Sequence, residues 1–154
     1  MSVTIALHAP TDPELSLLML RHTEAMHADT PVESIHMMDA SQLEAPGIWF
    51  FVMRDAGAPV GMGAFKRIDA THAEIKSMHV LSEMRGRGLA RVLLAHLVEA
   101  ASAQGFTRLS LETGAQDSFV PARQLYLAAG FEICPPFEGY QEDPNSCFMT
   151  KYLA

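Results

Sequence analysis

The sequence predicts an α+β fold built on a mostly antiparallel, mixed sheet with flanking helices. Residues 47–81 contain runs of aromatic and β-branched side chains divided by short turns, which is typical of consecutive antiparallel strands. After Gly88 the apolar residues recur at helical spacing, and another apolar run follows. A strand, a long helix and a second strand in that order indicate one crossover within the sheet. We expect a single domain over residues 1–154.

In the first half of the chain, one helix and several strands are expected. Asp12 followed by Pro13 is a typical helix start, and the apolar residues that follow have helical spacing. A short helical turn should end before Pro46, because the residue before a proline disfavours helix. The expected strands are residues 2–7, 47–55, 59–68 and 71–81.

The second half contains the most regular helix pattern in the chain. One apolar stripe is formed by Leu89, Val92, Leu93, His96, Leu97 and Ala100. Gly105 stands where a helix C-cap is expected. A second, shorter helix is predicted over residues 119–130. The remaining strands should be residues 106–113, 131–134 and 147–153.

Composition argues against several classes of protein. The chain has 18 Asp and Glu residues against 11 Lys and Arg, a net charge of −7, so a nucleic-acid-binding face is not expected. No apolar run approaches the roughly 20 residues that a bilayer requires, and the first residues lack the features of a signal peptide, so we expect a cytoplasmic protein with no membrane partner. Two cysteines and seven unpaired histidines do not form a metal-ligand pattern, and we predict no metal.

A cationic turn with two glycines precedes the long predicted helix. Arg85, Arg87 and Arg91 surround Gly86 and Gly88, a local basic concentration in an acidic chain. The first amides of a helix have no partner inside it, and the helix dipole adds positive charge there, so this turn is suited to phosphate. The spacing fits neither a mononucleotide P-loop nor a dinucleotide fingerprint. The alternative is a helix start whose arginines point into solvent.

Residues 85–90, RGRGLA, resemble the R/Q-x-x-G-x-G/A acyl-coenzyme-A motif of the GCN5-related N-acetyltransferase (GNAT) superfamily. Further segments are similar to that superfamily in the same order. Residues 73–97 resemble its fourth strand and third helix, and residues 122–131, ARQLYLAAGF, resemble its A-x-x-L-Y-x-x-x-G-F segment. The ending from residue 135 is similar to a bacterial YsnE-like branch. The resemblance is good over residues 48–154 and looser before them.

The resemblance implies a GNAT fold of about six to seven strands whose central fourth and fifth strands splay apart. It also implies acetyl-CoA as cosubstrate, with the pantetheine arm along the fourth strand and the pyrophosphate on the backbone amides of the turn. The coenzyme-binding residues implied in this way are Met78, His79, Val80, Arg85, Gly86, Arg87, Gly88, Leu89 and Ala90.

Two catalytic residues follow from the resemblance. Tyr126 occupies the position whose phenol donates a proton to the coenzyme sulfur, although a tyrosine in an apolar helix stripe is otherwise typical of a core. Glu74 aligns with a glutamate that some members use as general base, and a regular strand would place it on one face with Lys76, Met78 and Val80. The alternative for Glu74 is an ordinary salt bridge with Lys76.

The acceptor is expected to be the primary amine of a small molecule, attacked directly in a ternary complex. The residues expected to contact it are His27, His36, Lys76, Glu112 and Tyr140. The sequence leaves open whether acidic groups select a cationic amine or whether Lys76 and Arg67 select a carboxylate. The sequence departs from the superfamily pattern at Ser77 and Phe119. These positions concern the acceptor site and the contacts of the helix predicted over residues 119–130. A non-catalytic acyl-CoA-sensing domain is the competing hypothesis, and the resemblance implies a possible homodimer.

Overall fold

The computed structural model describes residues 3–153, apart from the side chain of Asp29. It forms a seven-stranded sheet in the order β1-β2-β3-β4-β5-β7-β6. All neighbouring strands are antiparallel except β4 and β5, which are parallel. The strands are β1 (Val3–Leu7), β2 (Ile48–Asp55), β3 (Ala58–Arg67), β4 (His72–Val80), β5 (Arg108–Gly114), β6 (Glu132–Ile133) and β7 (Ser146–Tyr152). The predicted α+β class with a mostly antiparallel sheet is therefore confirmed.

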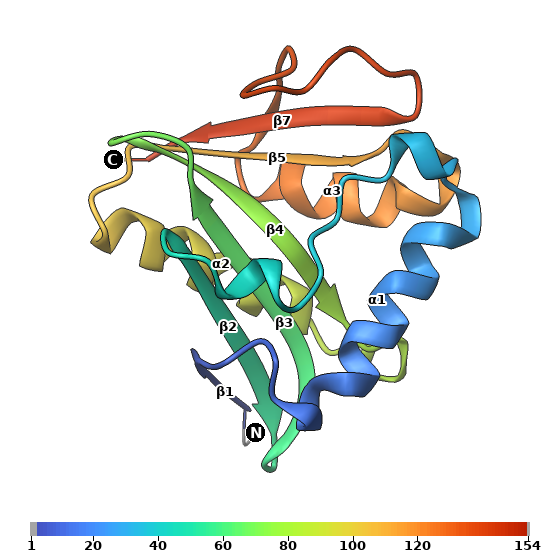
Figure 1. Cartoon of the computed structure of the whole chain (residues 1–154), viewed down its shortest axis with the longest axis vertical. Helices are drawn as coiled ribbons and strands as arrows, with labels where there is room; N and C mark the ends of the chain where they lie inside the picture. Colours follow the sequence, from blue (N-terminus) through green and yellow to red (C-terminus); the bar gives the residue numbers. More distant parts are fainter. Residues whose placement is uncertain (1–2, 154) are drawn as a thin grey trace.

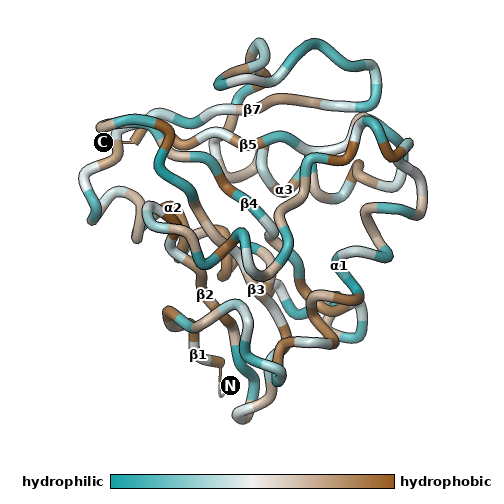
Figure 2. Tube along the Cα trace, viewed as in Figure 1, coloured by the Kyte–Doolittle hydropathy of each residue, from teal (hydrophilic) through white to brown (hydrophobic). Residues whose placement is uncertain are grey.

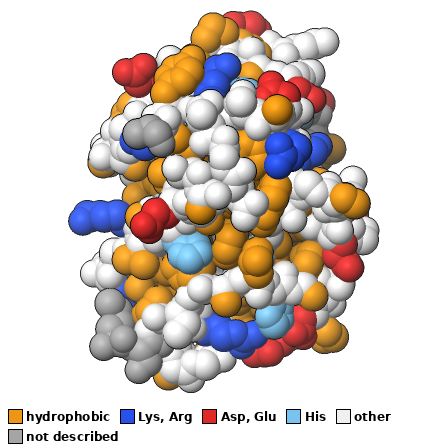
Figure 3. Space-filling model, turned by 90° about the vertical axis from the view of Figure 1, so that its left-hand side faces the viewer, with side chains coloured by type: hydrophobic (Ala, Val, Ile, Leu, Met, Phe, Trp, Pro, Cys, Tyr) orange, Lys and Arg blue, Asp and Glu red, His pale blue; other side chains and the backbone are white. Residues whose placement is uncertain are grey.

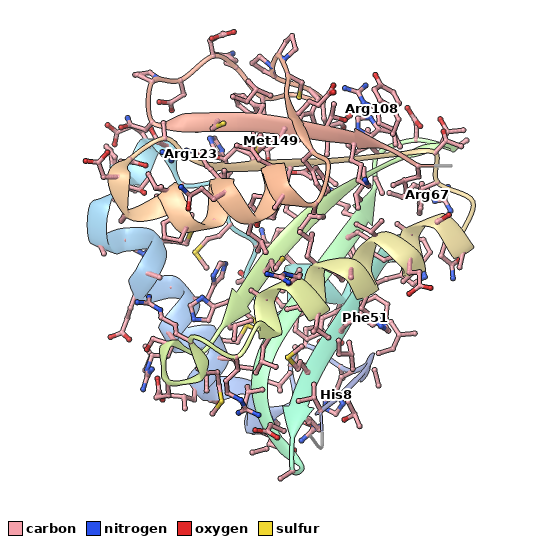
Figure 4. All side chains as sticks on the ribbon, turned by 180° about the vertical axis from the view of Figure 1, so that it is seen from behind. His8, Phe51, Arg67, Arg108, Arg123 and Met149 are labelled. Atoms are coloured by element: carbon pink, nitrogen blue, oxygen red, sulfur yellow. The ribbon has the colours of Figure 1, made fainter. Side chains whose placement is uncertain are left out.

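Three helices cover the two faces of this sheet. They are α1 (Ser16–Asp29), α2 (Leu89–Ala103) and α3 (Val120–Ala128). Alternation along β2 divides the core: Phe50 and Val52 pack with Leu18 of α1, whereas Phe51 packs with Leu97 of α2 on the opposite face. Seen from behind, α2 and α3 both lie over the sheet (Figure 4). Hydrophobic residues lie along β2 and β3, whereas the loop before β7 is mostly hydrophilic (Figure 2).

The expected helix ends are present, with one change in the buried face of α2. The Asp12 side chain accepts a hydrogen bond from the Glu14 amide, in a 3-10 turn (Pro13–Leu15) that leads into α1. Gly105 has a positive φ of 92° just after α2. The predicted stripe was wrong at Val92, which is 43% exposed, while Leu94 and Ala101 are buried. The stripe is rotated because α2 crosses the sheet with its 93, 94, 97 and 101 positions inward.

The parallel strands β4 and β5 separate after a short paired stretch. Only three pairs join them, His72 with Arg108, Ala73 with Leu109 and Glu74 with Ser110. Figure 1 shows β5 and β7 running together across the molecule while β4 diverges from them towards α1. The edge of β4 that faces β5 therefore has no strand partner beyond Glu74. The predicted splay is confirmed, and it opens the sheet in front of the start of α2.

A β-bulge in β4 corrects the expected direction of its side chains. From Lys76 to His79 the strand advances three residues while its partner β3 advances two, from Ala64 to Met62, and Ser77 has a φ of +56°. Because one residue is inserted, the alternation reverses beyond it. Glu74 and Lys76 thus do not share a face with Met78 and Val80, which pack towards Leu93 of α2, and His79 instead turns towards α1.

No helix within residues 3–153 is long and apolar enough to cross a membrane. On the side of the molecule seen in Figure 3, acidic and basic side chains are interspersed among hydrophobic ones.

Candidate active site

A continuous cleft of about 810 Å³ lies where β4 and β5 separate. Its walls come from α1, β4, the turn before α2, β5, α3 and the loop before β7. Most of the sequence-predicted site residues line it: Glu74, Lys76, Met78, His79, Val80, Arg85, Gly86, Gly88, Leu89, Ala90, Glu112, Tyr126, His36 and Tyr140. Arg87 and His27 are not among its lining residues.

One end of the cleft is formed by the turn that leads into α2. Gly86 and Gly88 have φ values of 81° and 71°, a conformation that favours glycine, and Gly88 is the N-cap without a side-chain capping bond. Among the described residues, none accepts a hydrogen bond from the backbone amides of residues 86–91. These amides, at the positive end of the helix dipole, are suited to an anion such as a diphosphate.

The arginines of this turn have different positions. Arg85 and Arg91 line the cleft and are exposed, so both can reach a negatively charged ligand there. Arg87 was expected to contribute as well, but its guanidinium donates to Asp55 Oδ2 on β2 at 2.7 Å and to Met84 Sδ at 3.1 Å. The Arg87 side chain therefore attaches the turn to the sheet and lies outside the cleft lining, where it was expected to contact the coenzyme.

Tyr126 closes the middle of the cleft from α3. Its hydroxyl points to Met78 Sδ of β4 at 4.0 Å, and burial, followed by the nearby Glu112 carboxylate, raises its pKa to about 12. The helix that carries it is anchored by Arg123, whose guanidinium donates to the carbonyls of Gly114 and Gln116 at the end of β5 (Figure 4). The Tyr126 phenol is therefore held protonated at neutral pH beside the unpaired edge of β4.

The opposite end of the cleft holds a hydrogen-bonded cluster of Glu74, Lys76, Tyr140 and the His36 carbonyl. The Tyr140 hydroxyl donates to Glu74 Oε2 at 2.5 Å. The Lys76 ammonium donates to the Tyr140 oxygen at 2.7 Å and to the His36 carbonyl at 3.1 Å, and lies 3.2 Å from Glu74 Oε2. Burial, followed by the Glu74 charge, raises the pKa of Tyr140. The salt bridge between Glu74 and Lys76, the alternative given for Glu74, is present within a cluster whose other members come from distant segments.

Glu112 lies on β5 across the gap from Glu74. Burial raises the pKa of its carboxyl, and the Ser146 hydroxyl, His36 and Lys76 oppose this only in part. Its position in the cleft lining makes it a second carboxylate available to the same ligand.

The histidine of α1 that lines the cleft is His22, whereas the predicted His27 lies outside the lining. His27 is exposed, and its Nδ1 lies 2.9 Å from the Thr23 carbonyl one turn back, so it does not reach the cleft. His22 does line the cleft, with its ring centroid 5.4 Å from that of His79. Burial lowers the pKa of His22 to about 4 and also lowers that of His79. Sequence reasoning missed His22 because the helical pattern alone does not indicate which residue of α1 faces β4.

A second cavity of about 440 Å³ lies on the outer side of the cluster. It shares His36, Glu74, Lys76 and Tyr140 with the cleft, and we call it the outer cavity. Its remaining lining is strongly polar: Glu33, Lys66, Glu138, Gly139, Gln141, Glu142 and Asp143. Within residues 3–153 there is no group of three or more His, Cys, Asp or Glu side chains arranged to hold a metal ion.

A helix start with unpaired amides beside two splayed strands forms a site suited to a phosphate-bearing ligand. Residues 16–131 match the family model described as the acetyltransferase (GNAT) family. The chain therefore belongs to the GNAT family of acetyltransferases and is an enzyme of the acyltransferase class.

Full-length relatives agree with this assignment. The chain is 43% identical over 143 residues to the uncharacterized N-acetyltransferase YsnE of Bacillus subtilis, covering 93% of this chain and 95% of YsnE. It is 35% identical over 153 residues to the IAA acetyltransferase of Azospirillum brasilense, covering 99% of both chains. Among solved structures, a Klebsiella pneumoniae protein assigned as an acyl-CoA N-acyltransferase superposes with a TM-score of 0.80 at 29% identity, covering 99% of this chain and 98% of that one.

Proposed function

We propose that the protein transfers the acetyl group of acetyl-CoA to a primary amine of a small, amino-acid-like acceptor, by direct attack in a ternary complex. The observation that carries this proposal is the single cleft with an anion-binding turn at one end and a carboxylate-phenol cluster at the other. An acyl donor and an amine can meet only where both ends face one space.

The coenzyme end suits the diphosphate of acetyl-CoA. The unpaired amides of residues 86–91 would hold the diphosphate, with Arg85 and Arg91 adding charge-assisted hydrogen bonds. The pantetheine arm would follow Met78, His79 and Val80, where the edge of β4 has no strand partner and its backbone groups are available. This path leads the thioester towards Tyr126.

The chemistry requires that the acceptor ammonium lose a proton and that the leaving thiolate gain one. Tyr126 suits the second task, because a phenol with a pKa of about 12 is protonated and positioned in the middle of the cleft. Glu74 suits the first as the final proton acceptor. It is only 4% exposed and lies at the opposite end of the space from the anion-binding turn.

The acceptor end favours a cationic molecule over one recognised by its carboxylate. The Lys76 ammonium has three protons and three acceptors within 3.2 Å, so it has no donor left for a substrate carboxylate. Arg67, the other candidate, lies over the rings of Trp49 and Phe106 and lines neither cavity.

The test is a thiol-release assay with acetyl-CoA against amino acids, polyamines, aminoglycosides and peptides, with the acetylated product identified by mass spectrometry. Binding of acetyl-CoA is measured separately by thermal shift, with acetylpantetheine, which lacks the diphosphate, as the matched control. We expect saturating acetyl-CoA to stabilise the protein by a few kcal/mol and acetylpantetheine to stabilise it less. Binding without turnover of any amine would support the acyl-CoA-sensing domain instead.

A further inference from the structure

The hydrogen-bonded cluster of Glu74, Lys76 and Tyr140 has a directional order that the family assignment does not explain. The buried carboxylate is the innermost member, and both donors of the cluster converge on its Oε2 atom. Tyr140 comes from the irregular loop before β7, sixty-six residues away in the chain. Its phenol therefore lies between the carboxylate and a ligand bound in the cleft, which Tyr140 also lines.

The phenol oxygen has the hydrogen-bonding capacity that a proton relay requires. It donates its hydrogen to Glu74 and accepts one from Lys76, and it retains capacity to accept one more hydrogen bond. An acceptor ammonium in the cleft can supply that bond. The ring is also held rigidly: its centroid lies 5.0 Å from His36, 5.2 Å from Phe137 and 5.4 Å from Phe148. Packing on three sides fixes where the hydroxyl points.

We propose that Tyr140 is a catalytic residue that takes the proton of the acceptor ammonium while passing its own proton to Glu74, with Lys76 positioning the phenol. This inference rests on the proposed function. An N–H bond of the ammonium breaks as an O–H bond forms on the phenol oxygen. The original phenol O–H bond breaks as one forms on Glu74 Oε2, and the neutral amine is left free to attack the thioester carbon.

The remaining protons balance as follows. Collapse of the tetrahedral adduct breaks the carbon–sulfur bond, and Tyr126 donates its proton to the leaving thiolate. The nitrogen loses its second proton as the amide forms, and this proton returns to Tyr126. The proton on Glu74 is then lost to water. Glu74 and Tyr140 also line the polar outer cavity, which gives this proton an exit that does not cross the coenzyme. The two cavities thus have separate tasks, acyl transfer in the cleft and proton release in the outer cavity.

Tyr140→Phe tests the relay, because it removes one oxygen and keeps the ring packing. With ethylamine, which is protonated at neutral pH, or with the best acceptor of the panel, we expect kcat/KM to fall by about 10²-fold or more. With 2,2,2-trifluoroethylamine, which is mostly neutral at the same pH, the loss should be less than about 5-fold, since no base is required. Tyr152→Phe, at an exposed tyrosine of β7, is the matched control and should leave both rates unchanged.

The outcomes separate the relay from the proposed function. Equal losses with both amines would assign Tyr140 a purely structural role and overturn the relay, as would an unchanged rate. The rate of Tyr140→Phe with ethylamine should also rise with pH towards the ammonium pKa more steeply than that of the wild type. If the wild-type protein binds acetyl-CoA and acetylates no amine, the proposed function fails together with the relay.

A second measurement needs no acceptor. Because the Glu74 charge helps raise the pKa of Tyr140, Glu74→Gln should shift one tyrosine of the free protein to a lower pKa in an ultraviolet titration. That transition should disappear in the double variant Glu74→Gln/Tyr140→Phe. A titration unaffected by Glu74→Gln would show that the two groups are not coupled in solution and would overturn the relay.

Discussion

The two ends of the cleft differ in the groups that form them: backbone amides at one end and side chains at the other. The coenzyme end uses backbone amides of one continuous turn, whose shape depends on Gly86 and Gly88. The acceptor end uses side chains brought together from three distant segments, represented by His36, Lys76 and Tyr140. A cradle of amides recognises a phosphate common to many reactions, whereas a cluster of side chains can be changed one residue at a time. In the proposed function, the first end would therefore define the cosubstrate and the second the acceptor.

Tyr126→Phe should give the largest effect and should separate leaving-group chemistry from amine activation. We expect kcat with acetyl-CoA to fall by about 10²- to 10⁴-fold, because the thiolate loses its proton donor. With 4-nitrophenyl thioacetate, whose thiolate leaves without a proton, the variant and the wild type should react at similar rates. A Tyr126→Phe enzyme with the wild-type rate on acetyl-CoA would remove Tyr126 from the chemistry.

The pH dependence of the free energy of unfolding tests whether His22, which lines the cleft, is buried in its uncharged form. The pKa of His22 is 6.5 when unperturbed and about 4 in the folded protein, so below pH 6.5 the unfolded chain binds more protons. The free energy of unfolding should therefore fall by about 3 kcal/mol as the pH decreases from 6.5 to about 4. In urea titrations at several pH values, His22→Gln should flatten this decrease. The exposed His27→Gln should not; an unchanged slope in His22→Gln would contradict the assignment.

Gly88→Ala should weaken acetyl-CoA without disturbing the acceptor end. A Cβ at a positive φ costs about 1–2 kcal/mol and displaces the amides, so we expect Kd for acetyl-CoA to rise about 10-fold. Gly57→Ala is the matched control, because Gly57 has a φ of 88° and open space around its Cβ position, as Gly88 does, but lies in the β2–β3 turn. Both variants should lose similar stability in urea titrations. Equal Kd values of Gly88→Ala and Gly57→Ala for acetyl-CoA would show that the turn before α2 does not hold the coenzyme.

Arg87 and Arg91 should give the smallest difference between two variants, which isothermal titration with acetyl-CoA can resolve. Arg87→Ala should change Kd less than about 3-fold and lower the free energy of unfolding by at most about 1 kcal/mol, since Arg87 forms a partly exposed ion pair with Asp55. Arg91→Ala should weaken binding more, about 5-fold, and this loss should shrink at high salt. The reverse order would restore Arg87 as a ligand of the diphosphate.

The same contrast explains how much of the molecule the sequence predicted. The strands, the three helices and the turn before α2 were accessible because periodicity, caps and glycine spacing are local signals. The relation of Glu74 to Val80 was mispredicted because Ser77 inserts a bulge that no residue type announces. The acceptor cluster was named only as separate residues, since hydrogen bonds such as that from Tyr140 to Glu74 depend on tertiary contacts. His22 and His27, five positions apart, were not distinguished for that reason.

The inserted residue at position 77 also determines which mutations β4 can tolerate. Ser77 is the extra residue of the bulge, so deleting it would leave Lys76 followed directly by Met78 and would keep every residue beyond it on its present face. Straightening the strand at an unchanged length would instead exchange these faces, so that His79 would enter the apolar layer under α2 and Met78 would turn towards α1. The bulge depends on the φ of +56° at Ser77, so we expect this position to accept glycine or asparagine and to reject β-branched residues.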